Sequence, residues 1–111
     1  MPEADYPADQ RETLAEAPGL RVRILSLSAG QRVPWHYHSD ITDRFFCMRG
    51  PMRVSTRAPE ASRVLHPGDT LAVGPGIAHS VEAASPAGCQ FMIVQGVGAY
   101  DFVPLAGGSD I

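Results

Sequence analysis

The sequence contains no lysine, only two cysteines and no long apolar run. A membrane-spanning helix needs about 18 or more consecutive apolar residues, so the lack of such a run excludes one. Cys47 and Cys89 are too few and too far apart for a disulfide framework or a paired-cysteine zinc site, and we expect two buried thiols. The first 19 residues are acidic, where a secretory or transit peptide would be basic, which predicts a cytoplasmic protein.

Because lysine is absent, nine arginines carry all the positive side-chain charge of a chain whose net charge is -3. Arg23 is two positions after Arg21, and Arg57 is four positions after Arg53, which is the spacing of one face of a strand. We therefore expect these arginines on a solvated sheet face and predict neither a nucleic-acid nor a membrane partner.

The length of 111 residues fits one domain. Residues 1–19 lack a sustained apolar period and hold three prolines, which predicts an N-terminal arm; Asp9 and Glu12 would favour a short helix over Asp9–Ala17. From residue 20 the pattern has period two, in short runs separated by turns that use many of the 11 glycines and 10 prolines. Residues 20–111 are thus predicted to form a single all-β domain, a sandwich, jelly roll or small barrel, with strands near residues 20–28, 45–49, 52–58, 62–66, 69–73, 79–83 and 89–97.

Three histidines and one aspartate are candidate metal ligands. His36 and His38 are separated by one residue in an extended run, so both side chains leave the same face with Cα atoms about 6.6 Å apart. Asp43 begins the next strand and His79 follows a Gly/Pro turn. Such a mixed N/O set suits Fe, Mn, Ni, Zn or Cu rather than Ca²⁺ or Mg²⁺. His66 precedes a turn and is expected to be exposed.

The spacing of these residues resembles that of the cupin family. GQRVPWHYHSDITDRFFCMRG is similar to the first cupin motif, and GDTLAVGPGIAHSVEA is similar to the second. The resemblance implies a double-stranded β-helix, the cupin jelly-roll barrel, with one divalent transition metal held inside by His36, His38, Asp43 and His79. The acidic place is usually Glu, so Asp43 either ligates the metal or accepts a hydrogen bond from a ligand. Two positions of the second motif also differ from the family pattern, since Gly74 stands where a proline is usual and Ala83 where an asparagine is usual.

The strand that begins at Asp43 predicts part of a cavity wall, because Phe45 and Cys47 share its face. The wall is expected to be apolar, without a cationic cluster, and to suit a small hydrophobic or aromatic molecule. Its predicted residues are Phe45, Cys47, Met52, Val54, Val81, Phe91 and Ile93.

The resemblance suggests a small metalloenzyme of dioxygenase or oxidoreductase type acting on a small organic molecule. Asp43 would then serve as the catalytic carboxylate, orienting a ligand or transferring a proton. Two alternatives remain, a non-catalytic ligand-binding or sensing module and a metal-dependent isomerase or decarboxylase. We also expect a homodimer, because an open jelly roll leaves strand edges to cover, with the basic face or the N-terminal arm at the contact.

Overall fold

The computed structural model describes residues 6–105, which form strands and no helix. No segment of this region is a helix long and apolar enough to cross a membrane. The strands are β1 (Gln10–Ala17), β2 (Leu20–Leu27), β3 (Arg32–Tyr37), β4 (Thr42–Arg49), β5 (Met52–Arg57), β6 (Glu60–Leu65), β7 (Thr70–Val73), β8 (His79–Ala83), β9 (Cys89–Gly96) and β10 (Val103–Pro104). The all-β prediction is confirmed.

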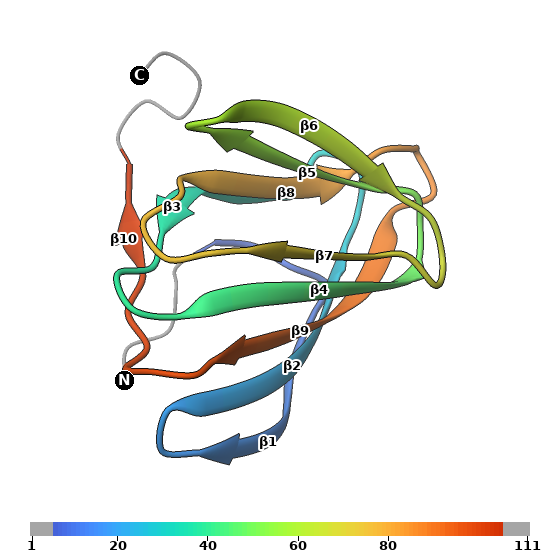
Figure 1. Ribbon diagram of the computed structural model, residues 1–111. Coiled ribbons are helices and arrows are strands. Elements are labelled where there is room, and N and C mark those ends of the chain that lie inside the picture. Colours follow the sequence, from blue (N-terminus) through green and yellow to red (C-terminus); the bar gives the residue numbers. More distant parts are fainter. Residues whose placement is uncertain (1–5, 106–111) are drawn as a thin grey trace.

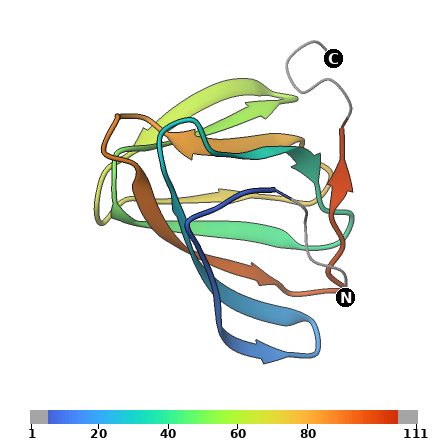
Figure 2. The same ribbon diagram turned by 180° about the vertical axis from the view of Figure 1, so that it is seen from behind.

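The strands form two antiparallel sheets that lie in two layers, as Figures 1 and 2 show from opposite sides. One sheet has the order β1-β2-β9-β4-β7 and the other has the order β10-β3-β8-β5-β6. Apolar side chains from the inner faces of both sheets meet between the layers, and Phe91, Met52 and Val54 are at most 1% exposed. The site described below lies in the same interior, so ligands can come from both sheets.

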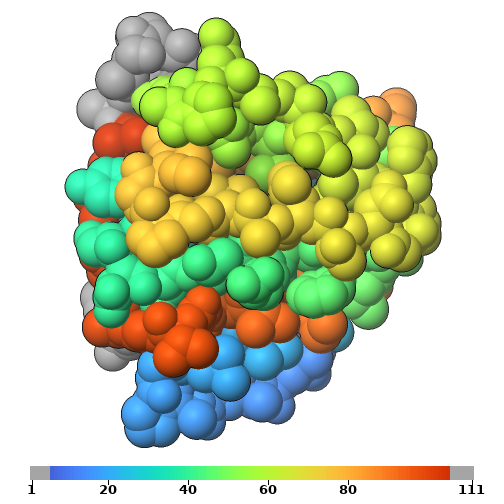
Figure 3. Space-filling model, viewed as in Figure 1, coloured from blue at the N-terminus to red at the C-terminus, as the bar shows by residue number. Residues whose placement is uncertain are grey.

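Strand β1 replaces the short helix that the sequence favoured in the N-terminal arm. Its residues pair with β2 from Gln10↔Ser26 to Ala17↔Leu20, and Pro18 and Gly19 make the turn between the strands. Gly19 has a φ of 79°, a conformation that glycine adopts without steric cost. Hydrogen bonding to β2 therefore overrides the helix-forming composition of the segment. Figure 3 shows the blue β1–β2 hairpin at the margin of the molecule.

The prediction of a solvated face for Arg21 and Arg23 is wrong. Both arginines are buried, with 6% and 4% exposure, and they alternate along β2 in phase with the buried Leu25 and Leu27. The inner face of β2 is thus apolar at one end and cationic at the other. Arg53 on β5 behaves more nearly as predicted, because 38% of its side chain is exposed and it lies 3.6 Å from a carboxylate oxygen of Glu82.

Candidate metal centre

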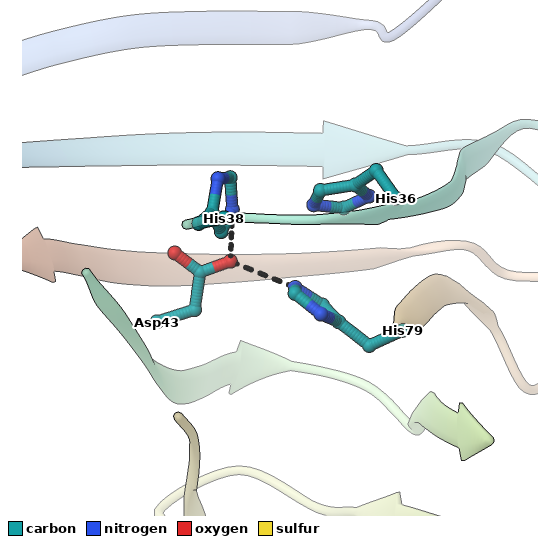
Figure 4. A group of neighbouring side chains, drawn as sticks. All are labelled: His36, His38, Asp43 and His79. Atoms are coloured by element: carbon teal, nitrogen blue, oxygen red, sulfur yellow. Dashed lines mark hydrogen bonds and ion pairs between the residues drawn. The ribbon is translucent and has the colours of Figure 1, made fainter. Parts of the chain in front are cut away.

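Four predicted side chains meet inside the barrel, and they come from both sheets. His36 lies on β3 and His79 on β8, while Asp43 comes from β4 of the facing sheet; His38 follows β3 directly. Each is at most 3% exposed, and one potential ligand atom from each lies within 4.8 Å of the others. Figure 4 shows these side chains pointing toward one another.

A register shift in β3 aims His36 into the barrel. Val33 pairs with Val81 and His36 pairs with His79, so three steps along β3 correspond to two along β8. In a regular strand, side chains three positions apart lie on opposite faces of the sheet. The extra residue in β3 removes this alternation, so that Val33 and His36 are both buried. The irregularity therefore places His36 beside His79, with ring centroids 4.3 Å apart.

Each histidine is oriented by a backbone carbonyl. The Nδ1 atoms of His36, His38 and His79 lie 2.7, 2.5 and 2.8 Å from the carbonyl oxygens of Pro34, Asp101 and Ile77, respectively. A carbonyl only accepts, so each Nδ1 carries a proton and donates it. The Nε2 atoms that face the centre are then the ones that offer lone pairs to a metal in the neutral rings. Fixing the outer nitrogen in this way is the usual support of a metal-bound histidine.

Asp43 reaches the histidines despite its short side chain. Its Oδ2 atom lies 2.8 Å from Nε2 of His38 and 2.9 Å from Nε2 of His79 (Figure 4). Two ligands about 2.1 Å from a metal and at right angles are separated by about 3.0 Å, so the same spacing suits a metal between them. Three nitrogens and one carboxylate oxygen thus make a donor set that fits a divalent transition metal.

A glutamine and an arginine that the sequence did not indicate hold the other oxygen of Asp43. Gln95 on β9 donates from Nε2 to Oδ1 of Asp43 over 3.1 Å. Arg21 donates from Nε and Nη2 to Oε1 of Gln95, both at 3.1 Å, and its guanidinium lies 3.9 Å from the ring centroid of Tyr100. These residues form one row across three strands, because Arg21 and Asp43 both pair with Gln95.

Burial and mutual contact shift the pKa values of the cluster in different directions. Burial, reinforced by the nearby His79, lowers the pKa of His36 to about 3. Burial also acts to lower the pKa of His38, but the hydrogen bond and the charge of Asp43 outweigh it and raise that pKa. For Asp43, burial is opposed by the hydrogen bonds from His38 and His79, which hold its pKa well below the usual range. Asp43 is therefore an ionised carboxylate, the form that a metal requires.

Four of the seven predicted wall residues line a cavity beside the cluster, namely Phe45, Val81, Phe91 and Ile93. Cys47, Met52 and Val54 are buried in the core and do not line it. The free space inside this cavity is small, about 20 Å³, which is room for about one water molecule. Its other lining residues outside the cluster are Tyr6, Arg23, Leu25, Val33, Gln95, Tyr100 and Phe102.

Arg23 changes the character of this wall. The sequence predicted an apolar wall without a cation, but Arg23 belongs to the lining. The available signal was the phase of β2, since Arg23 is two residues from Leu25 and so shares its face. His66 lies outside the cluster as expected, with 68% of its side chain exposed.

Comparisons with known proteins place the chain in a family. A family model described as a cupin domain matches residues 23–95. A double-stranded β-helix protein from Klebsiella pneumoniae is 20% identical, with a TM-score of 0.74 over 95% of this chain and 90% of that chain. KdgF from Halomonas sp. is 18% identical, with a TM-score of 0.70 over 86% of this chain and 90% of that chain.

An oxalate oxidase also shares the fold, at 20% identity and a TM-score of 0.70, over 83% of this chain and 50% of that chain. Among curated proteins, none matches the sequence. At these identities the solved structures show a common fold, and the family model covers well over half of the chain. The chain is therefore a member of the cupin family, with the jelly-roll barrel that its two motifs predict.

Proposed function

We propose that this protein is a small metalloenzyme of the dioxygenase type, which oxidises a small organic molecule at a metal held by His36, His38, Asp43 and His79. The observation that carries the proposal is the convergence of three Nε2 atoms whose partner Nδ1 atoms are all fixed by backbone carbonyls. A structural zinc site is usually closed by four ligands, but iron, manganese or nickel with six positions would keep two open.

The residues around the centre support such chemistry. A redox-active metal in this place would supply the electron transfer that reactions with O₂ require. Phe45 and Phe91 are at most 1% exposed, and with them the cavity walls exclude bulk water from the ligands. The carboxylate of Asp43 lies 2.8 Å from Nε2 of His38, so it would sit beside the metal and offers a nearby site for a proton. The fold shared with an oxalate oxidase is compatible with oxidation but does not specify it.

The test is metal content followed by oxygen consumption. The protein is purified under reducing conditions, its metals are measured by mass spectrometry, and O₂ uptake is followed with enols, thiols and catechol-like compounds. We expect about one metal ion per chain and turnover of at least one compound. His36→Ala should abolish both, while His66→Ala, which changes an exposed histidine outside the cluster, should leave both intact. A chain without affinity for Fe(II), Mn(II) or Ni(II) would refute the proposal.

The alternative of a non-catalytic ligand-binding module has a different signature. In that case His36→Ala would weaken ligand-dependent thermal stabilisation, while no compound would be turned over by the unaltered protein. The third alternative, an isomerase or decarboxylase, would use the same centre without consuming O₂. Product analysis under argon separates it from the proposed oxidation.

We also propose a homodimer that forms through the outer edge of β1. This strand has one hydrogen-bonded neighbour in its sheet, and its Leu14 side chain is 48% exposed. Exposed edge strands of this kind favour pairing with a second chain. Of the basic face expected as the other contact, Arg21 and Arg23 are buried, whereas the side chain of Arg53 is 38% exposed. A monomeric mass by light scattering would contradict the dimer.

A further inference from the structure

The free space beside the candidate ligands is too small for an organic substrate. It amounts to about 20 Å³, or about one water molecule, and each of the four ligands is at most 3% exposed. The substrate of the proposed function has several heavy atoms, so part of the cavity wall has to move before it can reach the metal. The part of the wall that moves most easily therefore controls access.

The chain after β9 closes one end of the barrel. Because β9 and β10 belong to different sheets, residues 97–102 cross from one layer to the other, as Figure 1 shows. Phe102 from this segment lines the cavity, and its ring centroid lies 4.2 Å from that of His36, with 14° between the ring planes. It is partly exposed, whereas Phe45 and Phe91 on the strands are at most 1% exposed. Phe102 therefore lies between the candidate ligands and the solvent.

Two other aromatic side chains that line the cavity are held by arginines. The guanidinium of Arg11 lies 4.4 Å from the ring centroid of Tyr6, and that of Arg21 lies 3.9 Å from the ring centroid of Tyr100. Such cation–π contacts favour a fixed ring. The phenyl ring of Phe102 has no hydrogen-bonding group, so it can turn without leaving a polar atom of its own unpaired.

The backbone next to Phe102 is anchored, and its anchors do not involve the phenyl ring. The carboxylate of Asp101 accepts hydrogen bonds from the backbone nitrogen of Ser39, at 2.8 Å, and from the Ser39 hydroxyl, at 2.5 Å. The carbonyl oxygen of Asp101 accepts a hydrogen bond from Nδ1 of His38. Rotation of the Phe102 side chain preserves these contacts, so the wall can open while His38 keeps its orientation.

We propose that Phe102 is the gate of the metal centre: its ring turns away from His36 to admit the substrate, and its size limits the substrate that can enter. The proposal rests on the proposed function and adds to it the residue that selects the substrate. Because the ring is nearly parallel to the imidazole of His36, the space that it vacates is a flat slot. A small planar molecule, such as an enol or a single aromatic ring, fits this slot best.

The first test measures access to His36 without metal. Diethyl pyrocarbonate, which acylates a free imidazole nitrogen, is added to the full-length protein in EDTA, and tandem mass spectrometry of the peptides gives the rate at each histidine. In the unaltered protein, the exposed His66 should react at least a hundredfold faster than the buried His36. Phe102→Ala should raise the rate at His36 at least tenfold, whereas Phe46→Ala, which removes a phenylalanine that does not line the cavity, should leave it within twofold.

A second variant and the buried thiols control for unfolding. Cys47 and Cys89 are at most 4% exposed, so an intact fold keeps them from reacting with a thiol reagent. If Phe102→Ala exposes these thiols, the comparison passes to Phe102→Leu, which keeps a large apolar side chain and should raise the rate at His36 at least threefold. An unchanged rate in a folded Phe102 variant would overturn the proposal, as would equal rates at His36 and His66 in the unaltered protein.

The second test addresses substrate size in the Co(II)-loaded protein. Imidazole and benzimidazole are planar cobalt ligands of different size, and the visible spectrum of Co(II) reports their binding. Phe102→Ala should bind benzimidazole at least tenfold more tightly than the unaltered protein does, with less than a threefold change for imidazole. An equal change for both probes would refute the limit on size.

The labelling separates the gate from the proposed function, because it uses neither metal nor substrate. If the chain takes up no Co(II) but labelling of His36 depends on Phe102, the proposed metalloenzyme fails and Phe102 still controls access to the histidines. If one Co(II) binds per chain and labelling ignores Phe102, the metal proposal stands and the gate fails.

Discussion

Gln95 links two buried charged side chains, and Gln95→Leu tests whether this link stabilises the protein. The glutamine accepts two hydrogen bonds from Arg21 and donates one to Asp43, all at 3.1 Å. Arg21 and Asp43 are 6% and 1% exposed, so water cannot readily replace the lost partner. Leucine has a similar size, and the variant therefore removes the hydrogen bonds with little change in volume.

The expected loss of stability in Gln95→Leu follows from the number of charged side chains that lose a hydrogen bond. A hydrogen bond to a charged group contributes about 1.5 to 3 kcal/mol. Arg21 loses one acceptor, and Asp43 keeps its contacts with His38 and His79 but loses one donor. Two such losses amount to about 3 to 6 kcal/mol, and burial of the leucine side chain returns about 1 kcal/mol. We expect the free energy of unfolding to fall by about 2 to 5 kcal/mol.

Urea unfolding followed by circular dichroism, with EDTA present, measures this difference without any contribution from metal. Gln90→Leu is the matched control, because Gln90 lies on the same strand and donates to Gln10, a neutral partner, over 2.8 Å. It should cost no more than about 1.5 kcal/mol. If Gln95→Leu lowers the free energy of unfolding by less than about 1 kcal/mol, or by no more than Gln90→Leu does, the link between Arg21 and Asp43 does not stabilise the fold.

Three further predictions concern the core, one turn and the alkaline limit of stability. Phe91 is fully buried, with its ring centroid 5.8 Å from that of a neighbouring phenylalanine, so Phe91→Ala should lower the free energy of unfolding by about 3 to 5 kcal/mol in urea. Gly88→Ala should cost more than about 1 kcal/mol, because φ is 81° and the new Cβ would lie 2.7 Å from the carbonyl oxygen of Leu27. Gly74→Ala, which meets nothing within 4 Å, should change stability by less than about 0.5 kcal/mol, and equal effects of the two substitutions would contradict this account. Burial, with a smaller contribution from the nearby thiol, raises the pKa of Cys89 from 9.0 to about 11. The folded protein then keeps a proton that the unfolded chain releases, so stability should fall by up to about 3 kcal/mol as the pH rises from about 9 to 11. Urea unfolding of Cys89→Ala across this range should lack that part of the decrease, and an unchanged slope would refute the assignment.

The sequence was sufficient to predict which residues meet at the candidate centre. His36, His38 and Asp43 lie close together in the chain, and the Gly/Pro turn before His79 marks where the fourth residue begins its strand. The resemblance of these spacings to the two cupin motifs therefore carried most of the information. What it did not indicate was the register shift in β3, which depends on how that strand pairs with β8.

The sequence did not predict the polar interior of β2. Even spacing of arginines shows that they share a face, but it does not show which face is buried. Leu25 and Leu27 continue the same phase, and giving them more weight than the charges of Arg21 and Arg23 would have predicted the observed orientation. Gln95 accepts the hydrogen bonds of Arg21 at the cationic end of β2. The two residues are 74 positions apart in the sequence, and only the pairing of β2 with β9 brings them together.

The helix expected before residue 18 failed for a different reason. Gln10–Ala17 contains several good helix formers, and local preference alone favours a helix there. Strand β2 supplies backbone partners along nearly the whole segment. These hydrogen bonds depend on tertiary structure, so the sequence of the segment by itself cannot predict them.

The cavity wall combines residues from inside and from outside the segment that the family model matches. The family match covers residues 23–95, which include all four candidate ligands, whereas Tyr6, Tyr100 and Phe102 contribute to the wall from outside it. The contact from Asp101 to His38 uses a backbone carbonyl, which any residue at that position would supply. Substitutions in the two flanking segments can therefore reshape the pocket while the candidate metal ligands stay unchanged. Exchanging these segments between cupins of similar size would be a direct way to redirect substrate choice.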